Sequence, residues 1–305
     1  MAQKGLQWWA VGSLVVLGLI WGGNMAAIKI GSREMAPIFQ AGLRSTVASL
    51  CLYLWMRWNG VPAFPGGRAT LHGLVLGLMF AAEFVFLYVG LNHTLASRAY
   101  VLLYTAPFFV ALGAHFFLPG DRLSLGKSLG LALAFGGVLA LFGRDLGGAS
   151  WGYLIGDLLA IGAGGLWAST TVYLKRFLAG KVQPAQTLFF HLFFSAPVLL
   201  GLSLILEERP LWGLSAPTVL AALYQGVVIA FASYLAWFTL VHRFPASLLH
   251  AFSFFTPVAG VFISGWLILG EPLSWRLLAA LGLVSLGLLM VNHVPGRAKE
   301  TSAGA

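Results

Sequence analysis

The stretch Gly120-Asp121-Arg122-Leu123-Ser124 recurs 150 residues later in the chain as Gly270-Glu271-Pro272-Leu273-Ser274. Each copy lies between two long apolar runs, so each predicts a turn between two helices. Chance matches are common in a chain rich in Leu and Gly, but a glycine, an acid, a leucine and a serine at one spacing are harder to attribute to chance. The pair therefore indicates an internal duplication.

The duplication extends outward from these turns. The same offset aligns Ala96-Ser97 with Ala246-Ser247, Pro107 with Pro257, and Leu131, Leu133, Gly137 and Leu139 with Leu281, Leu283, Gly287 and Leu289. At slightly smaller offsets Trp21 and Lys29 match Trp167 and Lys175, and Pro37 matches Pro184. We therefore predict two repeats, residues 1–146 and residues 147–305.

The composition places both repeats in a membrane. Of the 305 residues 59% are hydrophobic and 9% are charged, and the mean hydropathy is +0.87. An average soluble domain carries roughly 25% charged residues, so this chain cannot cover a soluble surface. A cytosolic enzyme and a nucleic-acid binder are excluded. The net charge of +9 comes from scattered cations rather than a basic run, as cytoplasmic loops of membrane proteins produce.

Ten apolar segments are long enough to cross a bilayer, which takes about 20 residues of helix. Loop residues such as Pro62, Pro210 and Pro245 separate them. The segments are too long, and too uniform in polarity, for strands of a β-barrel. They cover residues 8–30, 37–57, 70–92, 95–118, 124–143, 151–174, 184–206, 217–242, 246–269 and 274–293.

Five segments in each repeat fix the relation between the two copies. Because five is odd, the second copy must cross the membrane in the opposite sense. Inverted repeats are a recurrent architecture of secondary transporters, with the substrate site near the midplane between the halves. The predicted fold class is an all-α membrane protein of ten transmembrane helices in two inverted five-helix repeats. A membrane scaffold whose duplication records only ancestry is the alternative.

The cations in alternate loops predict the orientation. With the N-terminus inside, the inner loops carry eleven Lys and Arg residues: Lys4, Arg57, Arg68, Arg122, Lys127, Lys175, Arg176, Lys181, Arg243, Arg297 and Lys299. The outer loops carry six: Lys29, Arg33, Arg98, Arg144, Arg209 and Arg276. This bias predicts that both termini are cytoplasmic, in a multi-pass protein of the cell's inner membrane.

The sequence also carries a family resemblance. The resemblance is carried by Leu19-Ile20-Trp21-Gly22-Gly23-Asn24, by Leu43-Arg44 followed by Ala48, by the helices of Pro107 and Pro257, and by the two repeated turns. In these features the chain resembles the ten-helix EamA-type branch of the drug/metabolite transporter superfamily. The chain also resembles the YddG-type aromatic amino-acid exporters. The resemblance implies a ten-helix bundle around a central cavity that opens alternately to each side. It further implies export of amino acids and other small metabolites.

Three charged residues within the apolar segments are candidates for function. Glu83, in the middle of the third segment, is expected to face a cavity or a partner, and could carry a coupling proton or bind a substrate amine. A neutral acid that hydrogen-bonds a neighbouring helix is the alternative. Arg44 could bind a substrate carboxylate in a bidentate manner or pin its helix in a salt bridge. Asp157 is expected to pair with Arg44, and both are assigned structural roles.

A set of aromatic and polar residues could line the substrate cavity. Such groups suit a flat amphipathic solute through stacking and hydrogen bonds, or an organic cation through cation–π contacts. With Glu83, the predicted lining is Trp21, Asn24, Tyr88, Tyr100, Tyr104, Trp167, Tyr234 and His250.

Two prolines fall inside predicted helices. Pro107 and Pro257 each remove a backbone donor and free the carbonyl four residues earlier. Their matched positions predict either hinges beside the cavity or static kinks.

No cofactor and no metal are predicted. The histidines are too dispersed for a metal site, and we find no phosphate-binding loop, nucleotide motif or catalytic triad. The absence of an ATP site favours a secondary carrier over a pump.

The predicted function is export of amino acids, aromatic ones included, and related small metabolites by alternating access. A multidrug or organic-cation efflux carrier is the first alternative. A membrane enzyme or lipid scramblase and a non-transporting assembly subunit are weaker ones. The predicted partners are a small-molecule substrate and the bilayer, with no nucleic acid. Either a monomer or a homodimer is compatible with the sequence.

Overall fold

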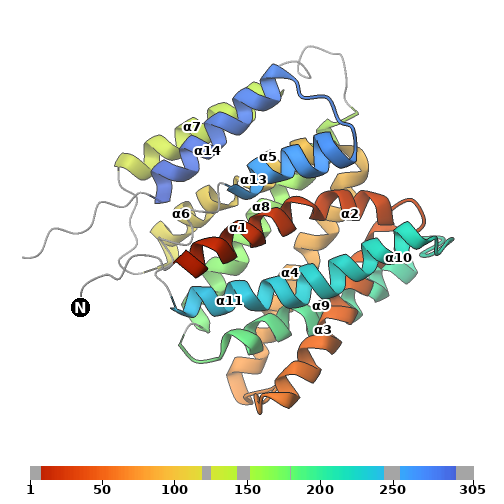
Figure 1. The fold of residues 1–305 in the computed structure, drawn as a ribbon. Coiled ribbons are helices and arrows are strands. Elements are labelled where there is room, and N and C mark those ends of the chain that lie inside the picture. The colour runs from red at the N-terminus through yellow and green to blue at the C-terminus, as the bar shows by residue number, and fades with distance from the viewer. Residues whose placement is uncertain (1–7, 119–124, 143–151, 179, 244–254, 293–305) are drawn as a thin grey trace, which may run out of the picture.

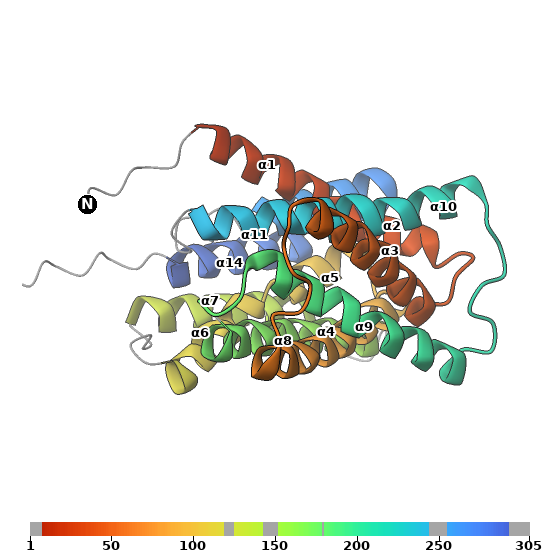
Figure 2. The same cartoon turned by 90° about the horizontal axis from the view of Figure 1, so that it is seen from below.

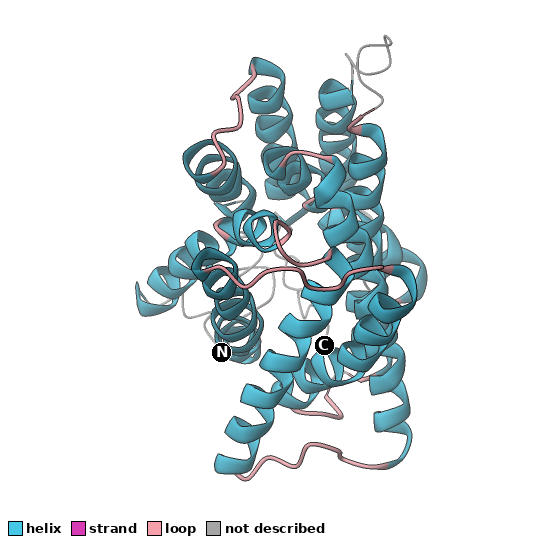
Figure 3. Cartoon of the chain, turned by 90° about the vertical axis from the view of Figure 1, so that its right-hand side faces the viewer, coloured by secondary structure: helices cyan, strands magenta, loops and turns pink. Residues whose placement is uncertain are grey.

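A computed structural model describes residues 8–118, 125–142, 152–178, 180–243 and 255–292. These residues form a bundle of helices that run roughly side by side (Figure 1), and no strand is drawn among them (Figure 3). The helices are α1 (Trp8–Gly22), α2 (Asn24–Gly31), α3 (Pro37–Trp58), α4 (Gly67–His93), α5 (Ala96–Leu103), α6 (Ala106–Phe117), α7 (Leu125–Phe142), α8 (Leu154–Phe177), α9 (Pro184–Leu206), α10 (Ala216–Leu223), η2 (Tyr224–Ser233), α11 (Tyr234–Arg243), α13 (Phe255–Gly260), η3 (Val261–Ile268) and α14 (Trp275–Asn292).

All ten predicted segments overlap helices in the described part of the chain. The segment 184–206 coincides with α9, which begins at Pro184 because a proline suits the first turn of a helix. By length and hydropathy, six helical stretches in the described residues are sufficient to cross a membrane. The protein is therefore a multi-pass helical chain. The number of ten crossings stays a prediction.

The first apolar segment is broken at Gly23, between α1 and α2. The hydroxyl of Tyr100 lies 2.5 Å from the carbonyl oxygen of Trp21 and 2.8 Å from that of Gly22. The Ser264 hydroxyl donates to the Gly22 carbonyl at 2.6 Å and accepts from the amide of Ala26 at 3.0 Å. Hydroxyls from other helices thus bond to backbone groups at the break, which the bilayer cannot satisfy.

The fourth, eighth and ninth segments also depart from regular α-helix. The fourth is interrupted at Tyr104 and Thr105, between α5 and α6. The eighth and ninth contain the π-helical stretches η2 and η3. π-Helical turns are uncommon and often occur at functional sites.

The main helix pairs join the first half of the chain to the second. α7 packs along α14, α4 along α8, α3 along α9, and α1 against α13. Figure 1 shows the α7–α14 pair at one edge of the bundle, and Figure 2 shows α3, α4, α8 and α9 on its opposite face. The two halves therefore form one interleaved bundle rather than two separate ones.

Glycine allows α4 and α8 to approach closely. A Cβ atom on Gly156 would lie 2.6 Å from the Gly90 carbonyl oxygen and 2.7 Å from the carbonyl carbon of His93. Small residues commonly permit such contacts between membrane helices. The outer surface of the bundle exposes large apolar side chains, including those of Phe116, Leu204 and Ile205, as a surface facing lipid would.

Polar contacts join the loops at one end of the bundle, which we call the clamped end (residues 29–38, 94–98, 157, 207–218 and 271). Ala36 N–H donates to the Pro210 carbonyl at 2.9 Å, and Met35 and Leu211 form an antiparallel bridge. Glu207 accepts hydrogen bonds from the amides of Ile38 and Phe39 at 2.7 and 2.9 Å. Figure 2 shows the loop from α9 to α10 at this end.

Candidate functional site

Arg44 is buried in the middle of the bundle without a hydrogen-bonding partner. It lies in the second turn of α3 and is 1% exposed. None of its three guanidinium nitrogens has a hydrogen-bond acceptor among the described residues. The guanidinium carbon instead lies 4.0 Å from the ring centre of Phe84, 5.4 Å from that of Tyr234 and 5.9 Å from that of Phe80. Such cation–π contacts offset part of the cost of burying the charge.

Glu83 lies in the same region, on α4 between Phe80 and Phe84, and is 7% exposed. The guanidinium of Arg44 is close enough to exert an electrostatic attraction on its carboxyl group, yet no hydrogen bond joins the two. The site therefore contains a cation and an acid that are near each other but unbonded.

Three further polar or aromatic side chains surround this pair. The Tyr88 hydroxyl donates to Gln225 Oε1 at 2.6 Å, and the Gln225 amide donates to the Ala27 carbonyl at 3.1 Å. Tyr234 packs edge-on against Trp21, with ring centres 6.2 Å apart. The Trp21 indole N–H donates to the Ser233 hydroxyl at 2.8 Å. We call Arg44, Glu83, Phe84, Tyr88, Tyr234 and Trp21 the central cluster.

The other predicted lining residues lie in different surroundings. The hydroxyl of Tyr100 binds the break in the first segment, as described above. The ring of Tyr104 contacts Trp167 edge-on at 5.7 Å. Asn24 Oδ1 is buried without a hydrogen-bond partner among the described residues. His250 lies outside the described residues.

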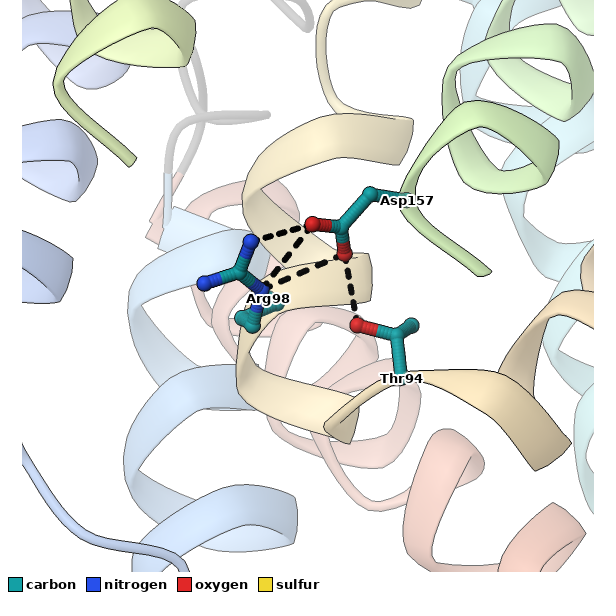
Figure 4. Close-up of polar contacts among 3 residues, drawn as sticks. All are labelled: Thr94, Arg98 and Asp157. Carbon is teal, nitrogen blue, oxygen red and sulfur yellow. Dashed lines mark hydrogen bonds and ion pairs between the residues drawn. The ribbon is translucent and has the colours of Figure 1, made fainter. Parts of the chain in front are cut away.

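The expected pairing of Asp157 with Arg44 is wrong, because Asp157 pairs with Arg98. Arg98 Nε lies 3.2 Å from Asp157 Oδ1 and 3.1 Å from Oδ2, and Arg98 Nη2 also contacts Oδ2. The Thr94 hydroxyl donates to Oδ1 at 2.6 Å (Figure 4). Asp157 is fully buried and Arg98 is 12% exposed. This ion pair joins α5 to α8 at the clamped end.

Glu271 was not singled out as a functional residue, although the repeated turn contains it. Its carboxylate accepts from the amides of Ala96 and Ser97 at 2.8 and 2.9 Å and from the Ser97 hydroxyl at 2.6 Å. An anion is stabilised at a helix N-terminus because the first amides lack partners within the helix. The contact ties the second half of the chain to α5 in the first half. The sequence signal that points to Glu271 is its match with Asp121 in the other copy of the repeated turn.

The prolines lie at irregular points of the backbone. Pro107 is the second residue of α6, directly after the break at residues 104–105, and Pro257 is the third residue of α13. A third proline, Pro197, lies inside α9. Whether any of them acts as a hinge stays a prediction.

A metal centre is not evident in the part of the chain that the structure describes. These residues contain no group of three or more His, Cys, Asp or Glu side chains that could hold a metal. A shallow apolar groove lies between α7 and α14, lined by Leu129, Ala132, Leu133, Gly136, Leu283 and Met290. It contains none of the predicted site residues.

The central cluster has the chemistry of a receptor for a small zwitterion. Arg44 offers N–H donors that can bind a carboxylate in a bidentate manner. Glu83 offers a carboxyl group that can accept from an ammonium. Phe84, Tyr234 and Trp21 provide the apolar and aromatic surface that an uncharged part of the ligand requires.

Comparison with known proteins matches the sequence to a transporter family. Residues 8–143 and 154–293 match the family model described as "EamA-like transporter family". A protein of Salmonella typhimurium named "Probable amino-acid metabolite efflux pump" is 30% identical over 294 residues, which cover 93% of this chain and 94% of that protein. A protein of the same name from Escherichia coli is 29% identical, covering 90% and 89%.

Two further comparisons agree with these. The "Uncharacterized transporter YoaV" of Bacillus subtilis is 25% identical over 94% of this chain and 97% of its own length. A crystal structure of a protein 21% identical in sequence superimposes with a TM-score of 0.66, covering 92% of this chain and 96% of that one. This structural likeness supports the fold alone.

Proposed function

Because the chain belongs to the EamA-like transporter family, we propose that it is a secondary carrier that exports amino acids, aromatic ones included, and related small metabolites. Export proceeds by alternating access across the inner membrane. The names of the Salmonella typhimurium and Escherichia coli relatives support an amino-acid metabolite as the transported class.

The observation that carries the proposal is the central cluster. Arg44 and Glu83 place a guanidinium and a titratable carboxyl group near each other inside an apolar bundle, and ionisable residues at membrane depth are costly and usually mark a pathway or a binding site. The surrounding rings of Phe84 and Tyr234 add a surface for the side chain of the solute.

The proposed architecture is ten membrane-spanning helices in two inverted repeats around a central cavity. Support comes from the two separate ranges that match one family description, residues 8–143 and 154–293, and from helix pairs that join the two halves. The excess of Lys and Arg in the inner loops favours cytoplasmic termini. The clamped end then faces the outside.

We assign Glu83 a role in proton coupling. Because Glu83 lies near Arg44, a substrate bound at Arg44 would alter how readily Glu83 binds a proton, and a proton on Glu83 would alter substrate binding. The competing assignment, in which Glu83 contacts only the ammonium of the solute, requires no pH gradient.

Counterflow in proteoliposomes tests the function. Vesicles loaded with unlabelled phenylalanine or threonine should take up the labelled amino acid in a saturable manner. Acceleration by a pH gradient that is lost in Glu83→Gln would establish proton coupling, and transport unaffected by the gradient would make the protein a facilitator. Exchange of quaternary ammonium compounds without exchange of any amino acid would replace this proposal by multidrug efflux.

The two ionisable groups of the site act in opposite directions on the organic-cation alternative, because Glu83 offers a cation a carboxyl group whereas Arg44 opposes its binding. Arg44 places a permanent positive charge against the aromatic rings that a cation would use. An organic cation at the same rings would meet like-charge repulsion in a region of low dielectric constant.

A further inference from the structure

We propose that Arg44 is the receptor for the substrate's carboxylate, so that a carboxylate is the obligatory feature of what this protein transports. The inference rests on the proposed transport function and deepens it. It would make the protein a carrier of organic acids and zwitterions that rejects their amides, esters and amines.

The hydrogen bonds missing at Arg44 are the first argument. A guanidinium has five N–H donors, and leaving a buried charged donor unpaired costs more free energy than a neutral one. Contacts with Phe84, Tyr234 and Phe80 act on the positive charge as a whole. The hydroxyls of Tyr88 and Tyr234 lie close to the guanidinium, but no described atom accepts from its N–H groups with hydrogen-bond geometry. An acceptor that arrives with the substrate would supply what the protein itself does not.

Two other buried acids, Asp157 and Glu271, show that this fold can pair buried charges. Asp157 has Arg98 and Thr94, and Glu271 has two amides and the Ser97 hydroxyl. Lys29 donates to the Thr94 carbonyl at 2.6 Å. Arg44 is more deeply buried than Arg98 and lacks any such partner.

The identity of the neighbours indicates the class of anion. Glu83 and the hydroxyls of Tyr88 and Tyr234 lie within electrostatic range of the guanidinium. A doubly charged phosphate would leave an uncompensated negative charge beside the single guanidinium in an apolar bundle, whereas a singly charged carboxylate matches the charge and the fork of one guanidinium. An attached ammonium would then be favoured by Glu83. The ligand is therefore a monocarboxylate, and an α-amino acid satisfies both groups.

The decisive experiment compares compounds that differ in one group. Wild-type proteoliposomes exchange labelled phenylalanine while phenylalaninamide, 3-phenylpropionate or phenethylamine compete. Phenylalaninamide keeps the ring and the ammonium but lacks the carboxylate. We expect it to compete at least about 100-fold more weakly than phenylalanine, because a site built to bond a polar group strongly rejects an analogue without it. Each compound's effect on the melting temperature of the purified wild-type protein provides a second measurement.

The variant that sharpens the test is Arg44→Gln, with Arg57→Gln as the matched control. Arg57 lies on the same helix and is exposed at its last turn. We expect the preference for acid over amide to fall to about 1 in Arg44→Gln and to remain at the wild-type value in Arg57→Gln. The wild-type comparison stands on its own if Arg44→Gln fails to fold.

The outcomes separate this inference from the proposed function. Exchange of phenylalanine that the amide inhibits equally well would overturn the role of Arg44 and keep amino-acid transport. Exchange of 3-phenylpropionate without any amino acid would keep the role of Arg44 and overturn the amino-acid assignment. Exchange of phenethylamine alone, or no exchange and no thermal stabilisation by any of the compounds, would overturn both.

Discussion

Arg98 and Arg44 both lie on helices of the first half, yet their charges have opposite surroundings. Arg98 is held by both carboxylate oxygens of the fully buried Asp157. Arg44 is more deeply buried and meets aromatic rings but no acceptor. The difference separates a charge that holds helices together from a charge that is left available. Each prediction below changes one side of this contrast.

The largest effect on stability is expected from Asp157→Asn. The change leaves Arg98 with a neutral amide whose single oxygen replaces two charged carboxylate oxygens, and breaking a buried pair on one side typically costs about 3–5 kcal/mol. Thermal unfolding of the purified protein in detergent should show a large loss, with the preference for carboxylate substrates unchanged in protein that survives. Wild-type stability in Asp157→Asn would remove the structural role assigned to the pair.

Arg44→Gln should show the reverse pattern. The change removes a buried unpaired charge together with its cation–π contacts, two contributions of opposite sign, so the unfolding free energy should stay within about 1 kcal/mol of wild type. The substrate preference should change strongly, as argued above. Thermal unfolding without ligand measures the first quantity. A loss as large as that of Asp157→Asn would mean that both arginines hold the fold.

A smaller effect is expected where a carboxylate binds backbone amides. Glu271→Gln keeps an acceptor but loses the charge that the N-terminus of α5 favours, which should cost about 1–2 kcal/mol. A double-mutant cycle with Ser97→Ala, which removes the hydroxyl bonded to Glu271, measures the coupling between them. Additive losses would show that the contact contributes little.

The packing beneath the Arg98–Asp157 pair provides a matched comparison of two glycines on α8. Gly156→Ala would bring a Cβ against the carbonyl of Gly90, and overpacking typically costs about 1–3 kcal/mol. Gly165→Ala meets no atom within 4 Å and should be neutral or slightly stabilising because alanine favours helix. The difference in unfolding temperature between the two variants is the measurement. Equal effects would mean that α4 and α8 can move apart freely.

The smallest effect concerns pH at the clamped end. The Ser215 amide donates to Glu34 at 2.7 Å, and this bond, with the hydroxyls of Thr218 and Ser215, holds the pKa of Glu34 below its ordinary value of 4.5. A lowered folded-state pKa stabilises the protein above pH 4.5, and that stability is lost as the pH falls through the lower folded-state value. Melting temperatures should therefore drop less on acidification in Glu34→Gln than in wild type. An identical acid response would show that Glu34 contributes nothing.

Much of the helix layout could be predicted from the sequence because it follows from local hydropathy and prolines. The range 184–206 coincides with α9, and α3 begins at the predicted Pro37. The breaks and π-helical stretches could not be predicted. The break at Gly23 depends on hydroxyls of Tyr100 and Ser264, which lie far away in the chain.

The candidate site was predictable as a set of residue types but not as a set of neighbours. Glu83, Arg44, Tyr88, Tyr234 and Trp21 were all singled out, because charges and hydroxyls in apolar helices are rare. Sequence spacing carries no signal for tertiary partners, so Asp157 was paired with the wrong arginine. Arg98 was counted as a loop cation, although it lies on α5.

The break at Gly23 has a consequence for how α1 can move. The hydroxyls of Tyr100 and Ser264 donate to the Gly22 carbonyl, and the hydroxyl of Tyr224 donates to the Ile20 carbonyl. A hydroxyl rotates about a single bond and can pass from one carbonyl to the next, so a small rotation of α1 exchanges acceptors without leaving a bond unmade. The Arg98–Asp157 ion pair instead holds one defined arrangement through both carboxylate oxygens. The hydrogen bonds that hold α1 can therefore exchange as the helix rotates, whereas the ion pair at the clamped end holds α5 and α8 in one arrangement.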